Sequence, residues 1–154
     1  MAMRASFLTL IYILLSGTWA FGQEKIQWDF SLNSSRCIEA KAQIETGWHI
    51  YSIHLEPEAG PVPTQITLEK NKAVNLTDPW MEVGQMIEHF DPNFGATVHY
   101  FEKEYALIAP VFVKKPTTVK GELTYMLCDD KRCLPPKTIP FEIKVTPYKL
   151  EKPN

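Results

Sequence analysis

The residues of this chain whose types and spacing could do chemistry are two cysteines, Cys128 and Cys133, separated by the polar sequence Asp-Asp-Lys-Arg. A short turn between them would bring their Cα atoms within about 6 Å, which is the reach of a disulfide. Because the closed loop is small, such a bridge would stabilise the fold by only about 2 kcal/mol in the chain-entropy model. The spacing therefore favours a redox-active pair slightly, and it leaves a plain stabilising bridge open.

The remaining cysteine and the histidines offer little further chemistry. Cys37 stands far upstream of the pair, and we expect it to be a lone, semi-buried thiol. A zinc site would need further Cys or His ligands near the pair. The four histidines show no paired ligand spacing and are expected on the surface or in the core: His49, His54, His89 and His99. We therefore expect neither a metal site nor a bound cofactor.

Strands must position the cysteine pair, because apolar and polar residues alternate with a period of two along most of the chain. The clearest strand candidates are residues 26–32, 38–44, 107–113, 119–127 and 139–145, and the shorter ones are 48–53, 64–69 and 97–101. About eight short strands separated by turn residues favour an antiparallel β-sandwich with no helix of useful length. Pro110 interrupts one candidate and predicts a sheet edge or a bulge there.

The alternation breaks at the cysteine turn and in two other segments. A strand would run into Cys128, and Pro135-Pro136 would stiffen the exit from the turn. Residues 56–63, which are rich in proline, are expected to form a loop. Residues 78–95 are also expected to be irregular, and they end with Phe90-Asp91-Pro92-Asn93-Phe94-Gly95. A loop that carries exposed aromatic residues usually covers another part of its protein.

The N-terminal segment predicts export. Arg4 precedes a short apolar run, Phe7–Leu15, and the small residues of Ala20-Phe21-Gly22 suit cleavage by a signal peptidase. The run is shorter than the roughly 20 residues that a membrane-spanning helix needs. We therefore expect residues 1–22 to be a cleaved signal peptide and residues 23–154 to form one domain outside the cytoplasm.

The charge balance excludes one class of partner. The chain has 16 basic and 18 acidic residues, for a formal net charge of −2, and it has no basic stripe. Nucleic-acid binding needs a concentration of positive charge, so we expect no nucleic-acid partner.

Four motifs carry a resemblance to a known family. They are Gly47-Trp48-His49-Ile50-Tyr51-Ser52, Gly60-Pro61-Val62-Pro63-Thr64, Asp91-Pro92-Asn93-Phe94-Gly95, and Tyr125-Met126-Leu127-Cys128 with Cys133-Leu134-Pro135-Pro136. On these motifs the chain, from about Trp28 to Val145, resembles the N-terminal domain of the thiol:disulfide interchange protein DsbD, in the stand-alone form found in bacteria. With this resemblance, redox function becomes the favoured interpretation of the cysteine pair.

The resemblance implies an immunoglobulin-like antiparallel β-sandwich with an active-site hairpin at one end. Cys128 and Cys133 would be the catalytic pair. The residues that match positions around the pair are Phe94 and Asp91 in a cap loop, with Phe94 as the shielding aromatic, and the aromatic residues Tyr51 and Trp48.

The implied activity is protein-disulfide reduction in the periplasm. A monomeric domain would receive electrons from a membrane thiol-reducing protein or its thioredoxin-like module and pass them to periplasmic thioredoxin-fold proteins. The spacing of the cysteines is shorter than in the best-known family member, which leaves the attacking cysteine open; the resemblance favours Cys133. The rival hypothesis is a non-catalytic β-sandwich module that binds carbohydrate or protein and carries a passive disulfide.

Overall fold

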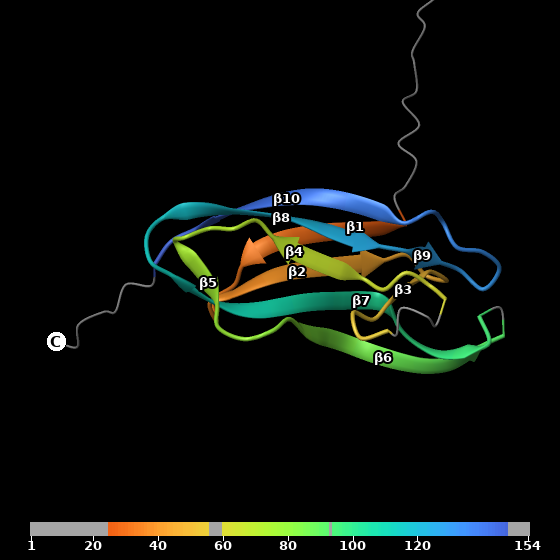
Figure 1. The fold of residues 1–154 in the computed structure, drawn as a ribbon. Coiled ribbons are helices and arrows are strands. Elements are labelled where there is room, and N and C mark those ends of the chain that lie inside the picture. The colour runs from red at the N-terminus through yellow and green to blue at the C-terminus, as the bar shows by residue number, and fades with distance from the viewer. Residues whose placement is uncertain (1–24, 56–59, 93, 148–154) are drawn as a thin grey trace, which may run out of the picture.

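The computed structural model describes residues 25–55, 60–92 and 94–147, which form two packed antiparallel sheets without any helix (Figure 1). The strands are β1 (Ile26–Leu32), β2 (Cys37–Ile44), β3 (His49–Tyr51), β4 (Gln65–Leu68), β5 (Val74–Leu76), β6 (Met81–Asp91), β7 (Ala96–Val113), β8 (Thr117–Tyr125), β9 (Leu127–Cys128) and β10 (Lys137–Val145). The predicted antiparallel β-sandwich is confirmed.

The alternation seen in the sequence separates core from solvent in these strands. In β2, Ile38, Ala40 and Ala42 are fully buried, whereas Lys41 on the opposite face is exposed. Strands β8 and β10 alternate in the same way. Successive side chains of a strand point to opposite faces, so a period of two buries one apolar row between the sheets.

The long strand β7 is the centre of the larger sheet. On one side it pairs first with β3 and then with β2, which follow one another along it. On its other side it pairs with β6 and β5. Strand β1 lies outside β2, and β9 lies outside β3. The second sheet has the order β10-β8-β4.

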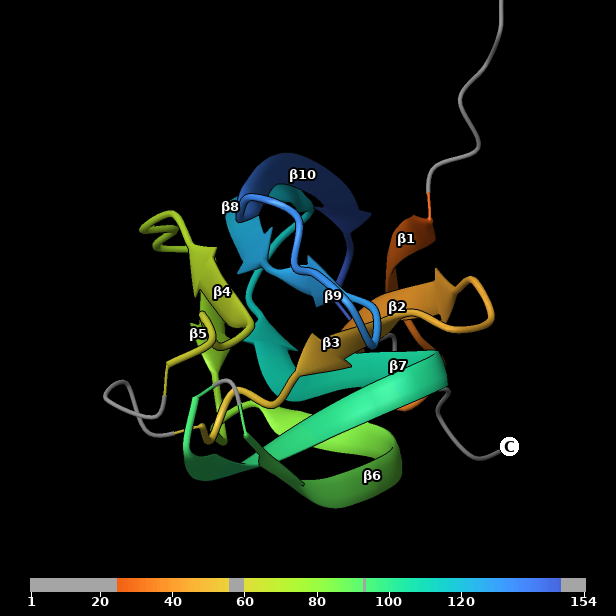
Figure 2. The same cartoon turned by 90° about the vertical axis from the view of Figure 1, so that its right-hand side faces the viewer.

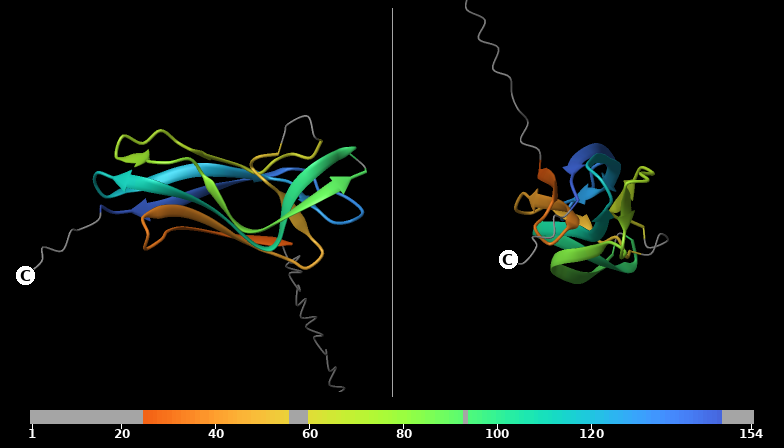
Figure 3. Two further views of the ribbon diagram at one scale, coloured as in Figure 1. Left: turned by 90° about the horizontal axis from the view of Figure 1, so that it is seen from below. Right: turned by 90° about the vertical axis from the view of Figure 1, so that its left-hand side faces the viewer.

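The chain passes from one sheet to the other just before the cysteines. Strand β8 belongs to the second sheet, and after Met126 the chain continues as β9, which pairs with β3 of the first sheet (Figure 2). The turn after β9 and the tip of the β6–β7 hairpin lie at the same end of the elongated domain, opposite the end where β10 finishes (Figure 3). The crossing therefore places the cysteine turn at one end of the sandwich.

Two groups of buried apolar residues form the interior. The larger group fills the space between the sheets and includes Ile38, Leu107 and Leu123. A smaller group lies at the cysteine end and consists of Tyr51, Leu55, Val98, Met126 and Cys128. Cys128 is thus part of a packed apolar cluster.

The expectation that residues 78–95 are irregular is wrong. Most of this segment is β6, which among the described residues pairs with β7 alone and forms a hairpin with it; residues 78–80 and the turn at the hairpin tip are irregular. The alternation fails here because apolar side chains of β6 remain exposed: Met81, Val83, Met86 and Phe90. An irregularity in the pairing between Gly84 and Met86 shifts the pattern further.

Pro110 does not lie at a sheet edge, because it occupies the inner strand β7, opposite Cys37 of β2. Its carbonyl accepts a hydrogen bond from the N–H of Thr77 (2.9 Å), in the gap between β5 and β6. The N–H and C=O of one strand residue point to the same side, so the missing donor of proline faces this gap. The ladder with β2 loses no hydrogen bond.

Several sequence predictions fall on other parts of the chain. The proposed signal peptide, residues 1–22, lies outside the described residues, as do residues 148–154 of the predicted domain. Residues 60–63 have no regular secondary structure, and the rest of the expected 56–63 loop also lies outside the described residues. Within the described part of the chain, no helix has the length and apolar character needed to cross a membrane.

Candidate functional site

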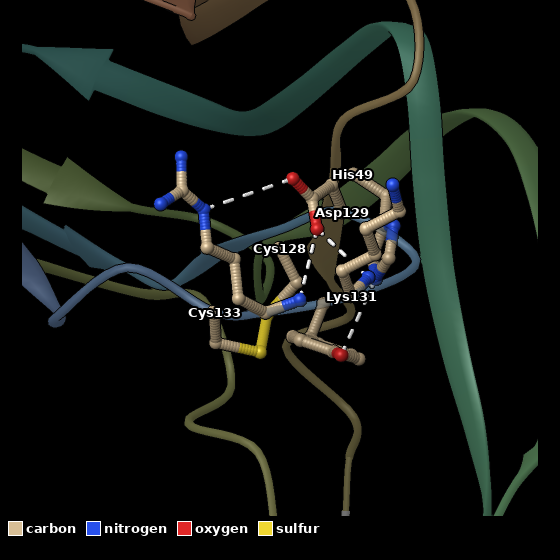
Figure 4. Close-up of a disulfide and its surroundings, with 7 residues drawn as sticks. His49, Cys128, Asp129, Lys131 and Cys133 are labelled. Atoms are coloured by element: carbon tan, nitrogen blue, oxygen red, sulfur yellow. Dashed lines mark hydrogen bonds and ion pairs between the residues drawn. A yellow bond between two sulfur atoms is a disulfide. The ribbon is translucent and has the colours of Figure 1, made fainter.

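Cys128 and Cys133 form a disulfide across a tight turn, with their Cα atoms 4.0 Å apart (Figure 4). The two residues also form an antiparallel bridge. The N–H of Asp129 donates to the carbonyl of Arg132 (2.9 Å), and the N–H of Leu134 donates to that of Leu127 (2.8 Å). Backbone hydrogen bonds on both sides of the disulfide therefore hold the turn together with the bridge.

The side chain of Asp129 shapes this turn. Its Oδ1 accepts hydrogen bonds from the N–H groups of Lys131 and Arg132, both at 2.8 Å. These two bonds, more than the neighbouring positive charges, lower the pKa of the Asp129 carboxyl. The polar residues between the cysteines thus have a structural role in the turn.

The two sulfur-bearing residues differ sharply in exposure. Cys128, in β9, has 1% of its surface exposed, whereas Cys133 is an exposed residue on the far side of the turn. An incoming thiolate can reach the sulfur of Cys133 far more easily than that of Cys128. If Cys133 is attacked, Cys128 becomes the leaving group.

A cavity of about 590 Å³ opens beside the disulfide. Four of the residues predicted to form the site line it, namely Cys133, Tyr51, Asp91 and Phe94. Asp91 is the last residue of β6 and Phe94 lies in the turn that follows, where the N–H of Gly95 donates to the carbonyl of Asp91 (2.8 Å). The hairpin tip therefore reaches the cysteine turn, although the two are far apart in the sequence.

Trp48 does not line this cavity. It is 8% exposed and packs in the larger core, with the ammonium group of Lys25 6.0 Å from its ring centroid. Its neighbour His49 faces the cavity, and adjacent residues entering a strand point to opposite sides. The resemblance matched Trp48 to a position near the cysteines, but its side chain packs in the core and is not part of the cavity wall.

The third cysteine is separate from the site. Cys37 begins β2, is buried and is free, and its Sγ contacts the carbonyl of Ser35 at 3.7 Å. It forms no disulfide with either residue of the pair.

His49 is a residue of the site that the sequence motifs alone did not indicate. It lies directly opposite Cys128 in the pairing of β3 with β9, and it lines the cavity. Its ring packs against that of Tyr100, with centroids 4.4 Å apart, and its Nε2 lies 3.3 Å from the hydroxyl of Tyr51. His49 and Tyr51 are two residues apart, so they lie on the same face of a strand. Because Tyr51 was a predicted site residue, this spacing could have indicated His49 as well.

Burial shifts the pKa values of His49 and Tyr51. It lowers the pKa of His49 below the ordinary value of 6.5, although the carboxylates of Glu102, Asp130 and Asp91 oppose the shift. Burial also raises the pKa of Tyr51 to about 12, with a smaller contribution from Asp91. Near pH 7 the site therefore contains a mainly neutral imidazole and a neutral phenol. Among the described residues, no three His, Cys, Asp or Glu side chains gather as metal ligands.

Comparisons with known proteins agree with the fold. The family model described as "Thiol:disulfide interchange protein DsbD, N-terminal" matches residues 20–144. The reduced DsbD N-terminal domain of Neisseria meningitidis is similar in structure, with a TM-score of 0.59 and 15% identity over 79% of this chain and 86% of that one. A chain from the complex between the DsbD and PilB N-terminal domains of the same organism gives a TM-score of 0.57 and 14% identity over 83% and 92% of the two chains. A comparison with curated protein sequences found no match.

Proposed function

Because this chain belongs to the family of the N-terminal domain of the thiol:disulfide interchange protein DsbD, we propose that it carries reducing equivalents through the Cys128–Cys133 pair. The observation that carries the proposal is the unequal exposure of the two cysteines beside a cavity. A purely stabilising disulfide has no need for an exposed cysteine in the wall of a cavity.

The proposed reaction begins with the disulfide. A donor thiolate attacks the Sγ of Cys133, the bond to the Sγ of Cys128 breaks, and Cys128 leaves with the electron pair. The donor's second thiolate then attacks the donor sulfur of this mixed disulfide and releases Cys133. Two electrons and two protons have then moved from the donor to the pair, and the donor has become a disulfide.

The same steps in reverse pass the electrons on. The thiolate of Cys133 attacks the disulfide of an acceptor, and Cys128 then attacks Cys133, which releases the reduced acceptor and re-forms the bridge. We propose a membrane thiol-reducing protein as the donor and thioredoxin-fold proteins as the acceptors, with the domain acting as a monomer in the periplasm. The family membership and the relative that assembles with a PilB domain support exchange with protein partners.

Trapping experiments test the role of each sulfur. Cys128→Ser and Cys133→Ser are compared in a Cys37→Ser background, so that each variant has one cysteine, and each is incubated with glutathione disulfide. Mass spectrometry should show rapid addition of glutathione to Cys133 and slow addition to Cys128, because Cys128 is buried. Equal rates would contradict the assignment.

A second measurement addresses the rival binding module. Dithiothreitol should reduce the wild-type pair under native conditions, and reduced thioredoxin, a thioredoxin-fold dithiol used as the probe, should do so faster at equal thiol concentration. Alkylation followed by mass spectrometry reads the result. A bridge that opens only when the protein unfolds would favour the passive disulfide.

A further inference from the structure

The burial of Cys128 means that its sulfur needs a proton when the disulfide opens, and the exchange of sulfur bonds does not supply one. When Cys133 is attacked, the leaving Sγ of Cys128 carries negative charge, yet Cys128 is 1% exposed within an apolar cluster. Burial in such surroundings disfavours a thiolate. A proton must therefore reach this sulfur from a neighbouring group as the bond opens.

His49 is placed to supply that proton. In the β3–β9 pairing it is the direct cross-strand partner of Cys128, so the two side chains project from the same face of the sheet. Cβ atoms of such partners lie about 4.5–5.5 Å apart, which is within reach of an imidazole. Figure 4 shows His49 beside the turn that carries the disulfide.

The imidazole of His49 can exchange protons with solvent through the cavity. His49 is only half-buried, and it lines the cavity together with the exposed residues Lys131 and Cys133. The Nε2 atom and the Tyr51 hydroxyl are 3.3 Å apart, and Tyr100 packs on the ring. These contacts hold the ring in place without closing it off from the cavity.

We propose that His49 is the proton-transfer residue for Cys128, an inference that rests on the disulfide exchange proposed above. As the donor thiolate bonds to Cys133 and the disulfide breaks, the imidazolium of His49 gives its proton to the Sγ of Cys128 and becomes neutral. In the return reaction, neutral His49 takes the proton from Cys128 as that sulfur attacks Cys133. The electrons stay with the sulfur atoms, and His49 moves only the proton.

The charged and titratable neighbours define the pH range of this effect. Those that face His49 are Tyr51 on its own strand, Tyr100 and Glu102 on β7, His89 and Asp91 from β6, and Asp129, Asp130, Lys131 and Arg132 in the cysteine turn. Burial lowers the pKa of His49 below 6.5, so the imidazolium is depleted as the pH rises from the acid side. The tyrosine pKa values are raised and that of Asp129 is lowered, so these groups titrate outside this range.

The test is the pH dependence of disulfide reduction by dithiothreitol in wild type and His49→Gln, with each rate constant divided by the thiolate concentration. The corrected wild-type rate constant should rise at least about tenfold as the pH is lowered from about 8 to about 5, which is a modest general-acid contribution. His49→Gln should lose this rise and keep the wild-type melting temperature. His99→Gln is the matched control, because His99 pairs with Glu88 outside the cavity and should keep the wild-type profile.

The outcomes separate this inference from the function on which it rests. A His49→Gln variant that retains the wild-type rise overturns the inference, while exchange by the wild type still supports the function. Loss of the rise in His89→Gln instead would assign the proton transfer to the other histidine of the cavity and also overturns it. A wild-type disulfide that dithiothreitol cannot reduce in the native state contradicts the function itself.

Discussion

The ring of Phe94 lies directly against the backbone of Gly60. A methyl group at position 60 would overlap the Cβ, Cγ and Cδ1 atoms of Phe94, so the contact depends on the absence of a side chain there. The turn at the end of β6 thus packs, through Phe94, against the segment that precedes β4. We propose that this contact with Gly60 holds Phe94 as a cap over the cavity beside the disulfide.

Replacing Phe94 with alanine should speed reduction of the disulfide by glutathione. The smaller side chain would open the cavity that Phe94 shares with Cys133, while the fold should persist because Phe94 is 37% exposed at a hairpin tip. Stopped-flow reduction and thermal melting measure the two effects. A rate no faster than wild type, or a melting temperature many degrees lower, would identify Phe94 as a core residue.

Gly60→Ala should reproduce the faster reduction while leaving Phe94 in the sequence. The added methyl group displaces the ring from this contact, and the φ of +114° at Gly60 adds backbone strain. Gly47→Ala is the matched control, because its φ of +83° imposes similar strain but nothing lies within 4 Å of the new methyl group. If both variants are reduced faster, backbone strain explains the effect and displacement of Phe94 does not.

Replacing both cysteines of the pair with serine should lower the free energy of unfolding by no more than about 2–3 kcal/mol, because the disulfide closes a small loop. The backbone hydrogen bonds that hold the turn in the oxidised protein should remain in the variant. Urea unfolding of the variant and of the oxidised wild type gives the difference. Failure of the variant to fold would favour a structural role for the bridge.

Glu82→Ala should destabilise the domain by about 2–4 kcal/mol, because the Glu82 carboxylate accepts three hydrogen bonds from groups of the interior. The donors are the Ser52 hydroxyl (2.7 Å), the Ile53 N–H (3.0 Å) and the Tyr105 hydroxyl (2.7 Å). Glu88→Ala is the control from the same strand, since Glu88 is 70% exposed and pairs only with His99 among the described residues; it should cost less than about 1 kcal/mol. Equal losses in urea unfolding would show that Glu82 has no special role.

Sequence alternation was sufficient for most of the fold and failed where burial was incomplete. The segments that became β2, β8 and β10 each bury one face, β1 packs a partly buried face on the core, and their period of two marked them as strands. Strand β6 leaves Met86 and Phe90 exposed at the edge of its sheet, so its apolar residues follow no clear period. Only its pairing with β7 makes it a strand.

The sequence by itself determined that Cys128 and Cys133 could form a disulfide, because the turn between them is local and its length limits how far apart they can be. The tertiary structure decided which of the two cysteines is exposed and which residues surround them. Residues as distant in sequence as His49 and Cys128, or Gly60 and Phe94, meet only through strand register and the course of the hairpins. Register depends on burial across the whole sheet, and no local spacing encodes it.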